Sequence, residues 1–86
     1  MSVENNEVQM TEISVNDFYV KLSERVSGTN AKLLLSSAIV GSSYAPVDGV
    51  EGTSPMNVDD VKSLCLELIK KGGPSFQVGK NMYHQI

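Results

Sequence analysis

Residues 57–71, NVDDVKSLCLELIKK, restrict the fold more than any other stretch, because they predict a single amphipathic helix. Asn57 is a typical N-cap, two aspartates follow in the first turn, and two lysines stand in the last turn, so that each charge complements the helix dipole. Gly72 and Pro74 then predict the end of the helix. Its apolar face consists of Val58, Val61, Leu64, Cys65, Leu68 and Ile69. Leu66 lies off this face, and we expect it to contact a second subunit.

Two apolar runs earlier in the chain, residues 14–26 and 31–41, predict a β-hairpin around the turn-forming residues 27–30. A strand places Val20 on the inward side of the first run, whereas a helix leaves this residue off the apolar stripe. The second run is continuously apolar and ends in β-branched residues, which favours a strand buried on both faces. A helix with Ser14 as its N-cap stays open as the alternative for the first run.

The end of the chain, residues 75–86, alternates briefly between apolar and polar residues. This alternation predicts a last short strand, with Phe76 and Val78 closing the core and a turn at Gly79. The predicted fold is therefore α+β, with a small hairpin or sheet, one helix packed on it and a C-terminal strand. The alternative is a small all-α domain of three helices. We expect a flexible acidic segment at residues 1–12 and one small domain over residues 13–86.

Composition argues against several functions. The chain has seven Lys or Arg residues against ten Asp or Glu residues, and its formal net charge is −3. Its basic residues are dispersed, whereas nucleic-acid binding needs clustered positive charge. No apolar run approaches the ~20 residues that span a bilayer, and the first residues do not have the pattern of a signal peptide. We therefore expect a cytoplasmic protein that binds neither nucleic acid nor membrane.

Chemistry-bearing motifs are scarce. The Gly-Lys pair near the end does not complete a phosphate-binding loop, because Gly73 and Gly79 are one residue too far apart and Asn81 replaces the required hydroxyl. Cys65 and His84 supply too few ligands for a closed zinc site. Cys65 on the apolar helix face is expected to be an inert core thiol. The sequence thus predicts no enzyme, no cofactor and no metal site.

Two polar stretches, each with an aromatic residue, are candidates for contacts with a ligand or a partner. The candidate residues are Ser42, Ser43 and Tyr44 in the loop after residue 41, and Lys80, Asn81, Tyr83 and His84 near the end of the chain.

Short matches are spread along the chain: NNEV at 5–8, EGT at 51–53, DV at 60–61, FQV at 76–78, and His84. Together they resemble the BssS family of small bacterial biofilm regulators. Residues 36–47, SSAIVGSSYAPV, depart from this resemblance, since a more charged strand and loop is expected there. The resemblance implies a small regulatory protein without a known catalytic centre, and it transfers no functional residue.

These observations favour a small non-enzymatic regulatory or interaction protein that binds a partner protein. A chain of 86 residues buries a small core, so we also expect a homo-oligomer. The alternative function is a phage-type inhibitor of host defence that binds or sequesters a small nucleotide signal. In that alternative, the Ser-Ser-Tyr loop and Lys80 would hold the polar ligand.

Overall fold

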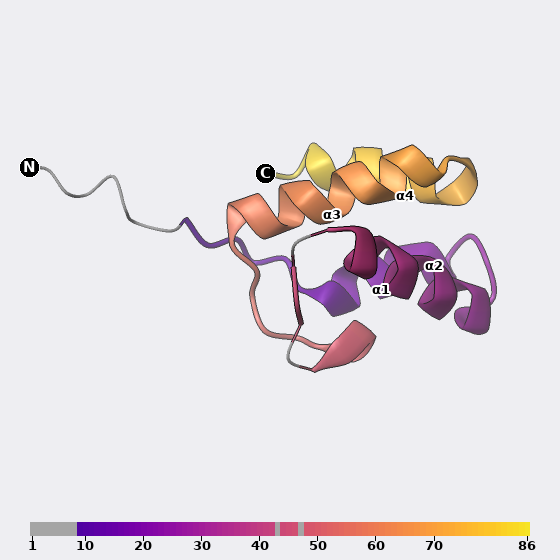
Figure 1. Cartoon of the computed structure of the whole chain (residues 1–86), viewed down its shortest axis with the longest axis horizontal. Helices are drawn as coiled ribbons and strands as arrows, with labels where there is room; N and C mark the ends of the chain where they lie inside the picture. Colours follow the sequence, from indigo (N-terminus) through magenta and orange to yellow (C-terminus); the bar gives the residue numbers. More distant parts are fainter. Residues whose placement is uncertain (1–8, 43, 47) are drawn as a thin grey trace, which may run out of the picture.

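The computed structural model describes residues 9–42, 44–46 and 48–86, and this part of the chain is built from helices. The helices are α1 (Val15–Ser23), α2 (Gly28–Gly41), the short 3₁₀ helix η2 (Gly49–Glu51), α3 (Val58–Lys71) and α4 (Gly73–Tyr83). Helices α3 and α4 form a hairpin, and this hairpin lies over the pair α1 and α2 (Figure 1).

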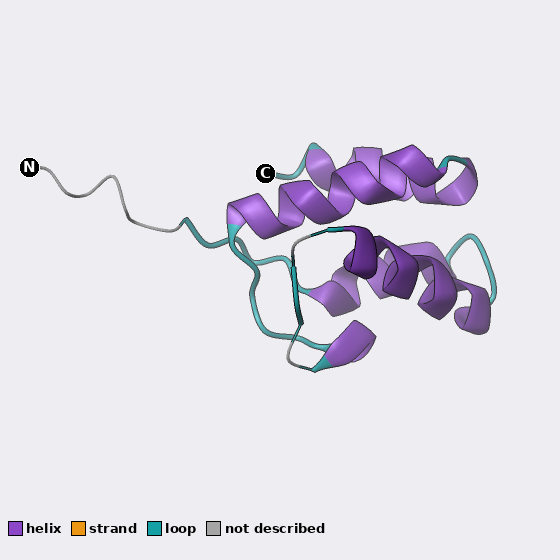
Figure 2. Cartoon of the chain, viewed as in Figure 1, coloured by secondary structure: helices purple, strands orange, loops and turns teal. Residues whose placement is uncertain are grey.

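The predicted α+β fold is wrong for the described residues, which contain no sheet (Figure 2). The all-α alternative fits, with four α-helices in the described part of the chain where three were expected. Within residues 9–42, 44–46 and 48–86, β pairing is limited to one isolated antiparallel bridge between Met10 and Asn57.

The expected hairpin at residues 14–41 is a pair of helices because tertiary burial outweighs local strand preference. In α1, the stripe Val15, Phe18 and Leu22 is buried, and in α2 the stripe Ala31, Leu35 and Ala38 is buried. Val20, the residue that favoured a strand, is simply 45% exposed on α1.

The expected hairpin turn is in fact a helix start. The Ser27 hydroxyl accepts the Asn30 backbone N–H at 3.3 Å and caps α2. Ser14 caps α1, where its backbone N–H donates to the Asp17 carboxylate at 2.8 Å, the return bond of a capping box. Serine, glycine and asparagine are common both in hairpin turns and at the starts of helices, so the sequence alone does not decide between a hairpin and two helices.

The expected C-terminal strand is also wrong, because residues 73–83 form α4. Pro74 stands in the first helical turn, where its missing N–H leaves no hydrogen bond unmade, so it begins a helix here. Phe76 does not close the core as expected but is 37% exposed, whereas Ser75 is buried. Gly79, expected at a turn, lies inside α4.

The predicted helix at residues 57–71 is confirmed. Asn57 Oδ1 accepts the Asp60 N–H at 2.8 Å, and the helix ends at Lys71. Its inner face contributes Val61, Leu64, Cys65 and Leu68 to the core that all four helices share.

Residues 9–13 run beside residues 56–58 as an extended segment that precedes α1. The Thr11 N–H donates to the Met56 carbonyl at 2.9 Å, and the Met56 N–H donates to the Ile13 carbonyl at 2.8 Å. These bonds anchor the chain entering α1 to the chain entering α3. The expected segment at residues 1–12 lies mostly outside the described residues, since the description begins at residue 9.

Candidate protein-interaction site

The outer side of the α3–α4 hairpin brings together several of the residues that the sequence singled out. A shallow groove of about 210 Å³ is lined by Leu66 and Ile69 from α3, Lys80 and Tyr83 from α4, and His84. Leu66 was expected to contact a subunit, and Lys80, Tyr83 and His84 were expected to contact a ligand or partner. The structure therefore merges two separate predictions into one surface.

Helical spacing explains why these side chains share one surface. Leu66 and Ile69 are three residues apart on α3, and Lys80 and Tyr83 are three residues apart on α4. Phe76 lies one turn before Lys80 and extends the exposed stripe of α4. We call Leu66, Ile69, Phe76, Lys80, Tyr83 and His84 the α3–α4 face.

Gly79 allows the two helices of this face to pack closely. A Cβ atom at Gly79 would lie 2.7 Å from the Cys65 carbonyl oxygen, and 3.0 Å from both Leu68 Cβ and Ile69 Cγ1. These distances are shorter than normal van der Waals contacts, so any residue other than glycine would require the two helices to move apart.

The α3–α4 face combines apolar surface with positive charge. Leu66 is 50% exposed and Tyr83 is 37% exposed, although both are large apolar or aromatic side chains. Lys80 Nζ lies 5.9 Å from the centroid of the Phe76 ring, within range of a cation–π interaction. Among the described residues that line the groove, none is a carboxylate.

The other predicted contact residues do not join this face. Asn81 lines a different groove, with Lys21, Glu24 and Arg25 of the α1 end. Ser42 has a structural role, because its hydroxyl donates to the Ile39 carbonyl at 2.9 Å and accepts the Tyr44 N–H at 3.2 Å. Ser43 lies outside the described residues.

Tyr44 is half-buried against the core and has acidic surroundings. Burial raises the pKa of its phenol above the usual value, and the negative charges of Asp60 and Asp48 raise that pKa further. The same carboxylates would repel a phosphate at this position. The groove that contains Lys80 is not lined by Ser42 or Tyr44. The expected nucleotide-holding residues are therefore not brought together in that groove.

Cys65 is fully buried in the core, and burial raises the pKa of its thiol to about 12. At neutral pH it is therefore a protonated thiol rather than a nucleophilic thiolate. Within residues 9–42, 44–46 and 48–86, no three His, Cys, Asp or Glu side chains come close enough together to hold a metal ion.

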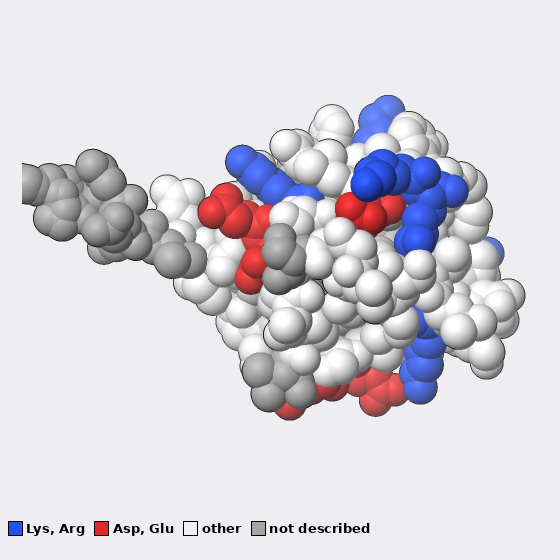
Figure 3. Space-filling model, viewed as in Figure 1, with Lys and Arg blue, Asp and Glu red and all other residues white. Residues whose placement is uncertain are grey.

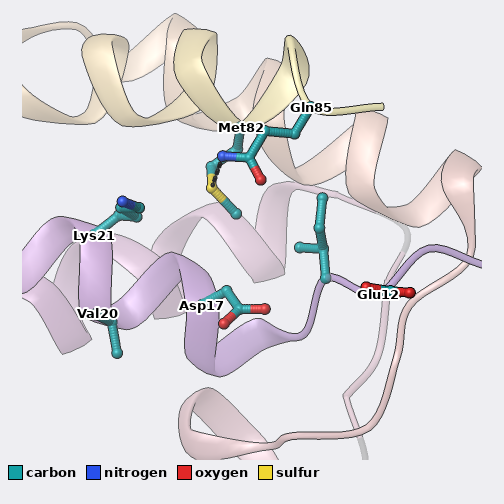
Figure 4. Close-up of a pocket in the computed structure, with 7 residues that line it drawn as sticks. Glu12, Asp17, Val20, Lys21, Met82 and Gln85 are labelled. Atoms are coloured by element: carbon teal, nitrogen blue, oxygen red, sulfur yellow. Dashed lines mark hydrogen bonds between the residues drawn. The ribbon is translucent and has the colours of Figure 1, made fainter.

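A second groove, of about 300 Å³, lies between the chain entering α1, α1 itself and the end of α4 (Figure 4). Its lining includes Glu12, Asp17, Lys21 and Gln85, and Asp17 already accepts the Ser14 N–H. The Gln85 amide donates to the Met82 sulfur at 3.7 Å. This groove could not be predicted from the sequence, because residues from both ends of the chain line it and come together only in the fold.

Comparisons with protein-family models, curated proteins and solved structures found no match for this chain. The resemblance to the BssS family thus stays a prediction from the short segments alone. Every helix in the part of the chain that the structure describes is too short or too polar to cross a lipid bilayer.

Proposed function

We propose that this protein is a small non-enzymatic interaction protein that binds a partner protein through the α3–α4 face. The observation that carries the proposal is the half-exposed Leu66 beside the exposed Tyr83 in one mostly apolar groove. Full burial of a leucine side chain stabilises a protein or a complex by about 1.5–3 kcal/mol, and half of this surface is still available here. Grouped exposed apolar side chains are typical of protein-binding surfaces.

The shape of the groove favours a protein over a small ligand. Pockets for small molecules usually enclose about 300–1,000 Å³ and bury most of the ligand. The α3–α4 groove is smaller, at about 210 Å³, and lies between two exposed helix surfaces. Tyr83 in its lining is a residue type that is enriched in protein interfaces and among the side chains that contribute most to binding.

Site-specific crosslinking in cells that naturally contain the protein tests this proposal. A photo-reactive benzoylphenylalanine at position 66 should crosslink to one defined protein, because Leu66 is the most exposed apolar side chain of the face, at 50%. The matched control places the same group at Leu33, which is 64% exposed in the middle of α2.

Four results are informative. A defined product from position 66 but not from position 33 supports the proposal. Equal products from both positions, or none from position 66, overturn it. A product that joins two copies of this chain would identify the partner as a second copy, and would support the expected homo-oligomer.

A further inference from the structure

We infer that the partner segment that docks on the α3–α4 face is an acidic amphipathic helix; this inference rests on the proposed function. The α3–α4 face supplies an apolar floor and the positive charge of Lys80, which makes no ion pair with the described residues. These two features together specify the chemistry of the segment that fits the face.

The geometry favours a helix as the docking element. Two packed helices leave a shallow groove between them, and a third helix can pack its side-chain ridge into that groove. Helix α3 has 14 residues and is therefore about 21 Å long at 1.5 Å per residue. Its floor residues Leu66 and Ile69 are one turn apart, so they match a partner helix with apolar residues at the same spacing. A strand would need an open backbone edge, which this helical face does not offer.

Positive charges surround the apolar floor. Lys62 and Lys70 lie one turn before and one turn after Leu66 on α3, and Lys80 lines the groove from α4. Among the described residues, Lys62 and Lys80 make no ion pair, whereas Lys70 pairs with Glu67 at 3.2 Å. Before Leu66 along α3, the nearest carboxylates are Asp59 and Asp60, which stand in the first turn of the helix.

The charge of this hairpin differs from that of the rest of the chain. Residues 57–86 contain four Lys or Arg and three Asp or Glu residues, whereas residues 1–56 contain three Lys or Arg and seven Asp or Glu residues. On the side shown in Figure 3, most of the Lys and Arg atoms lie over the half of the molecule that α3 and α4 form, with groups of Asp and Glu atoms beside them. An acidic partner segment is complementary to this surface.

The same charges disfavour a second copy as the occupant. In a two-fold symmetric dimer both subunits use the same patch, so Lys62 and Lys80 of both copies would enter one interface. Like charges that meet in an interface oppose association. An acidic helix meets the same lysines with favourable interactions and covers the same apolar floor.

Nuclear magnetic resonance titration of the ¹⁵N-labelled full chain tests the inference. The probe is a stapled helical peptide of about 15 residues with a leucine stripe flanked by glutamates, and its twin has lysine at every glutamate position. The acidic peptide should perturb Leu66, Ile69, Lys80 and Tyr83, and bind roughly three- to tenfold more tightly than its twin at low salt. This preference should shrink as salt screens the charges.

Charge-reversed variants sharpen the test. Lys80→Glu and Lys62→Glu should each weaken binding of the acidic peptide and strengthen binding of the basic twin. Leu66→Gln should weaken both peptides, while the matched Leu33→Gln on α2 should leave both unchanged.

Each contrary result overturns the inference in a distinct way. Equal binding of both peptides at the α3–α4 face would overturn the acidic character while leaving the proposed function intact. Perturbation confined to other surfaces, or none by either peptide, would overturn the helical occupant. Concentration-dependent sedimentation of the free chain, lost in Leu66→Gln, would assign the face to a second copy. The proposed function itself fails only if position 66 yields no selective crosslink.

Discussion

Gly79 is the residue at which the close packing of α3 and α4 can be tested most directly. In Gly79→Ala, the new methyl group would meet the backbone carbonyl of Cys65 at 2.7 Å, and a backbone atom cannot move aside as a flexible side chain can. We expect Gly79→Ala to lower the free energy of unfolding by about 1–3 kcal/mol, as overpacking in a core does. Chemical denaturation monitored by circular dichroism would measure this.

Gly41→Ala is the matched control for that change. Gly41 is also helical, but a Cβ atom there would meet only the flexible Glu67 side chain, which can rotate away. Alanine favours a helix over glycine by up to about 1 kcal/mol, so Gly41→Ala should be neutral or stabilising. Equal destabilisation by the two substitutions would contradict the close-packing argument.

Ser75 and Ser14 are two buried serines that should respond oppositely to alanine. Among the described residues, the Ser75 hydroxyl is the buried side-chain polar group without a hydrogen-bond partner, and Ser75 is 1% exposed. Removing an unsatisfied buried hydroxyl should raise the free energy of unfolding by about 1 kcal/mol in Ser75→Ala. Ser14→Ala should lower it by about 1 kcal/mol, because it removes the N-cap hydroxyl, which donates to the Asp17 carboxylate at 3.3 Å. Thermal melts of both variants measure these opposite effects. A lower melting temperature for Ser75→Ala would show that the Ser75 hydroxyl makes a stabilising hydrogen bond, and would contradict the prediction.

At the scale of elements, the turn between α3 and α4 depends on left-handed backbone at Gly73, whose φ is +60°. A Cβ atom there would meet nothing within 4 Å, so any effect of substitution is purely conformational. We expect Gly73→Ala to lower the free energy of unfolding by about 1–2 kcal/mol. The mirror-image residue, D-alanine, prefers positive φ and should preserve stability in a chemically synthesised chain. Equal loss with L- and D-alanine, measured by urea denaturation, would contradict this account.

The elements also show why the predicted α+β fold contained only one of the four α-helices of the described residues. Residues 57–71 contain local signals that agree with one another, since Asn57 caps the helix, charges match its dipole and one face is apolar. In α2, by contrast, the buried stripe is Ala31, Leu35 and Ala38. The exposed residues Leu33 and Val40 are also apolar, so the sequence pattern does not distinguish the buried stripe from the rest of the helix. In α4, the small residues Ser75 and Gly79 face the core, while the large apolar residue Phe76 faces outward. A prediction that places the large apolar residues in the core therefore assigns this helix the wrong buried face. Only packing against α3 explains that arrangement.

At the scale of the whole molecule, the candidate site was partly predictable. The off-stripe position of Leu66 marked an outward apolar residue from helical geometry alone. The sequence also singled out Lys80, Tyr83 and His84, although it placed them after a strand. It could not show that these residues lie beside Leu66, because that proximity depends on the reversal of the chain at Gly72 and Gly73. Phe76 was missed as a surface residue because the expected strand placed it in the core, whereas in α4 it is exposed.

Cys65 connects the core of the whole molecule to the pH dependence of its stability. Burial raises the pKa of the thiol from 9.0 to about 12, so the folded chain holds this proton more tightly than the unfolded chain. The resulting stabilisation is fully present below pH 9 and is lost as pH rises from 9 towards 12. Between pH 8 and 10.5, we expect this group to lower the free energy of unfolding by about 2 kcal/mol. Urea denaturation across this range should show a smaller loss for Cys65→Ala than for the natural chain, even though the cavity makes the variant less stable at pH 7. The two chains differ only at position 65, so parallel pH profiles would mean that folding does not raise the pKa of this thiol, and would contradict the prediction.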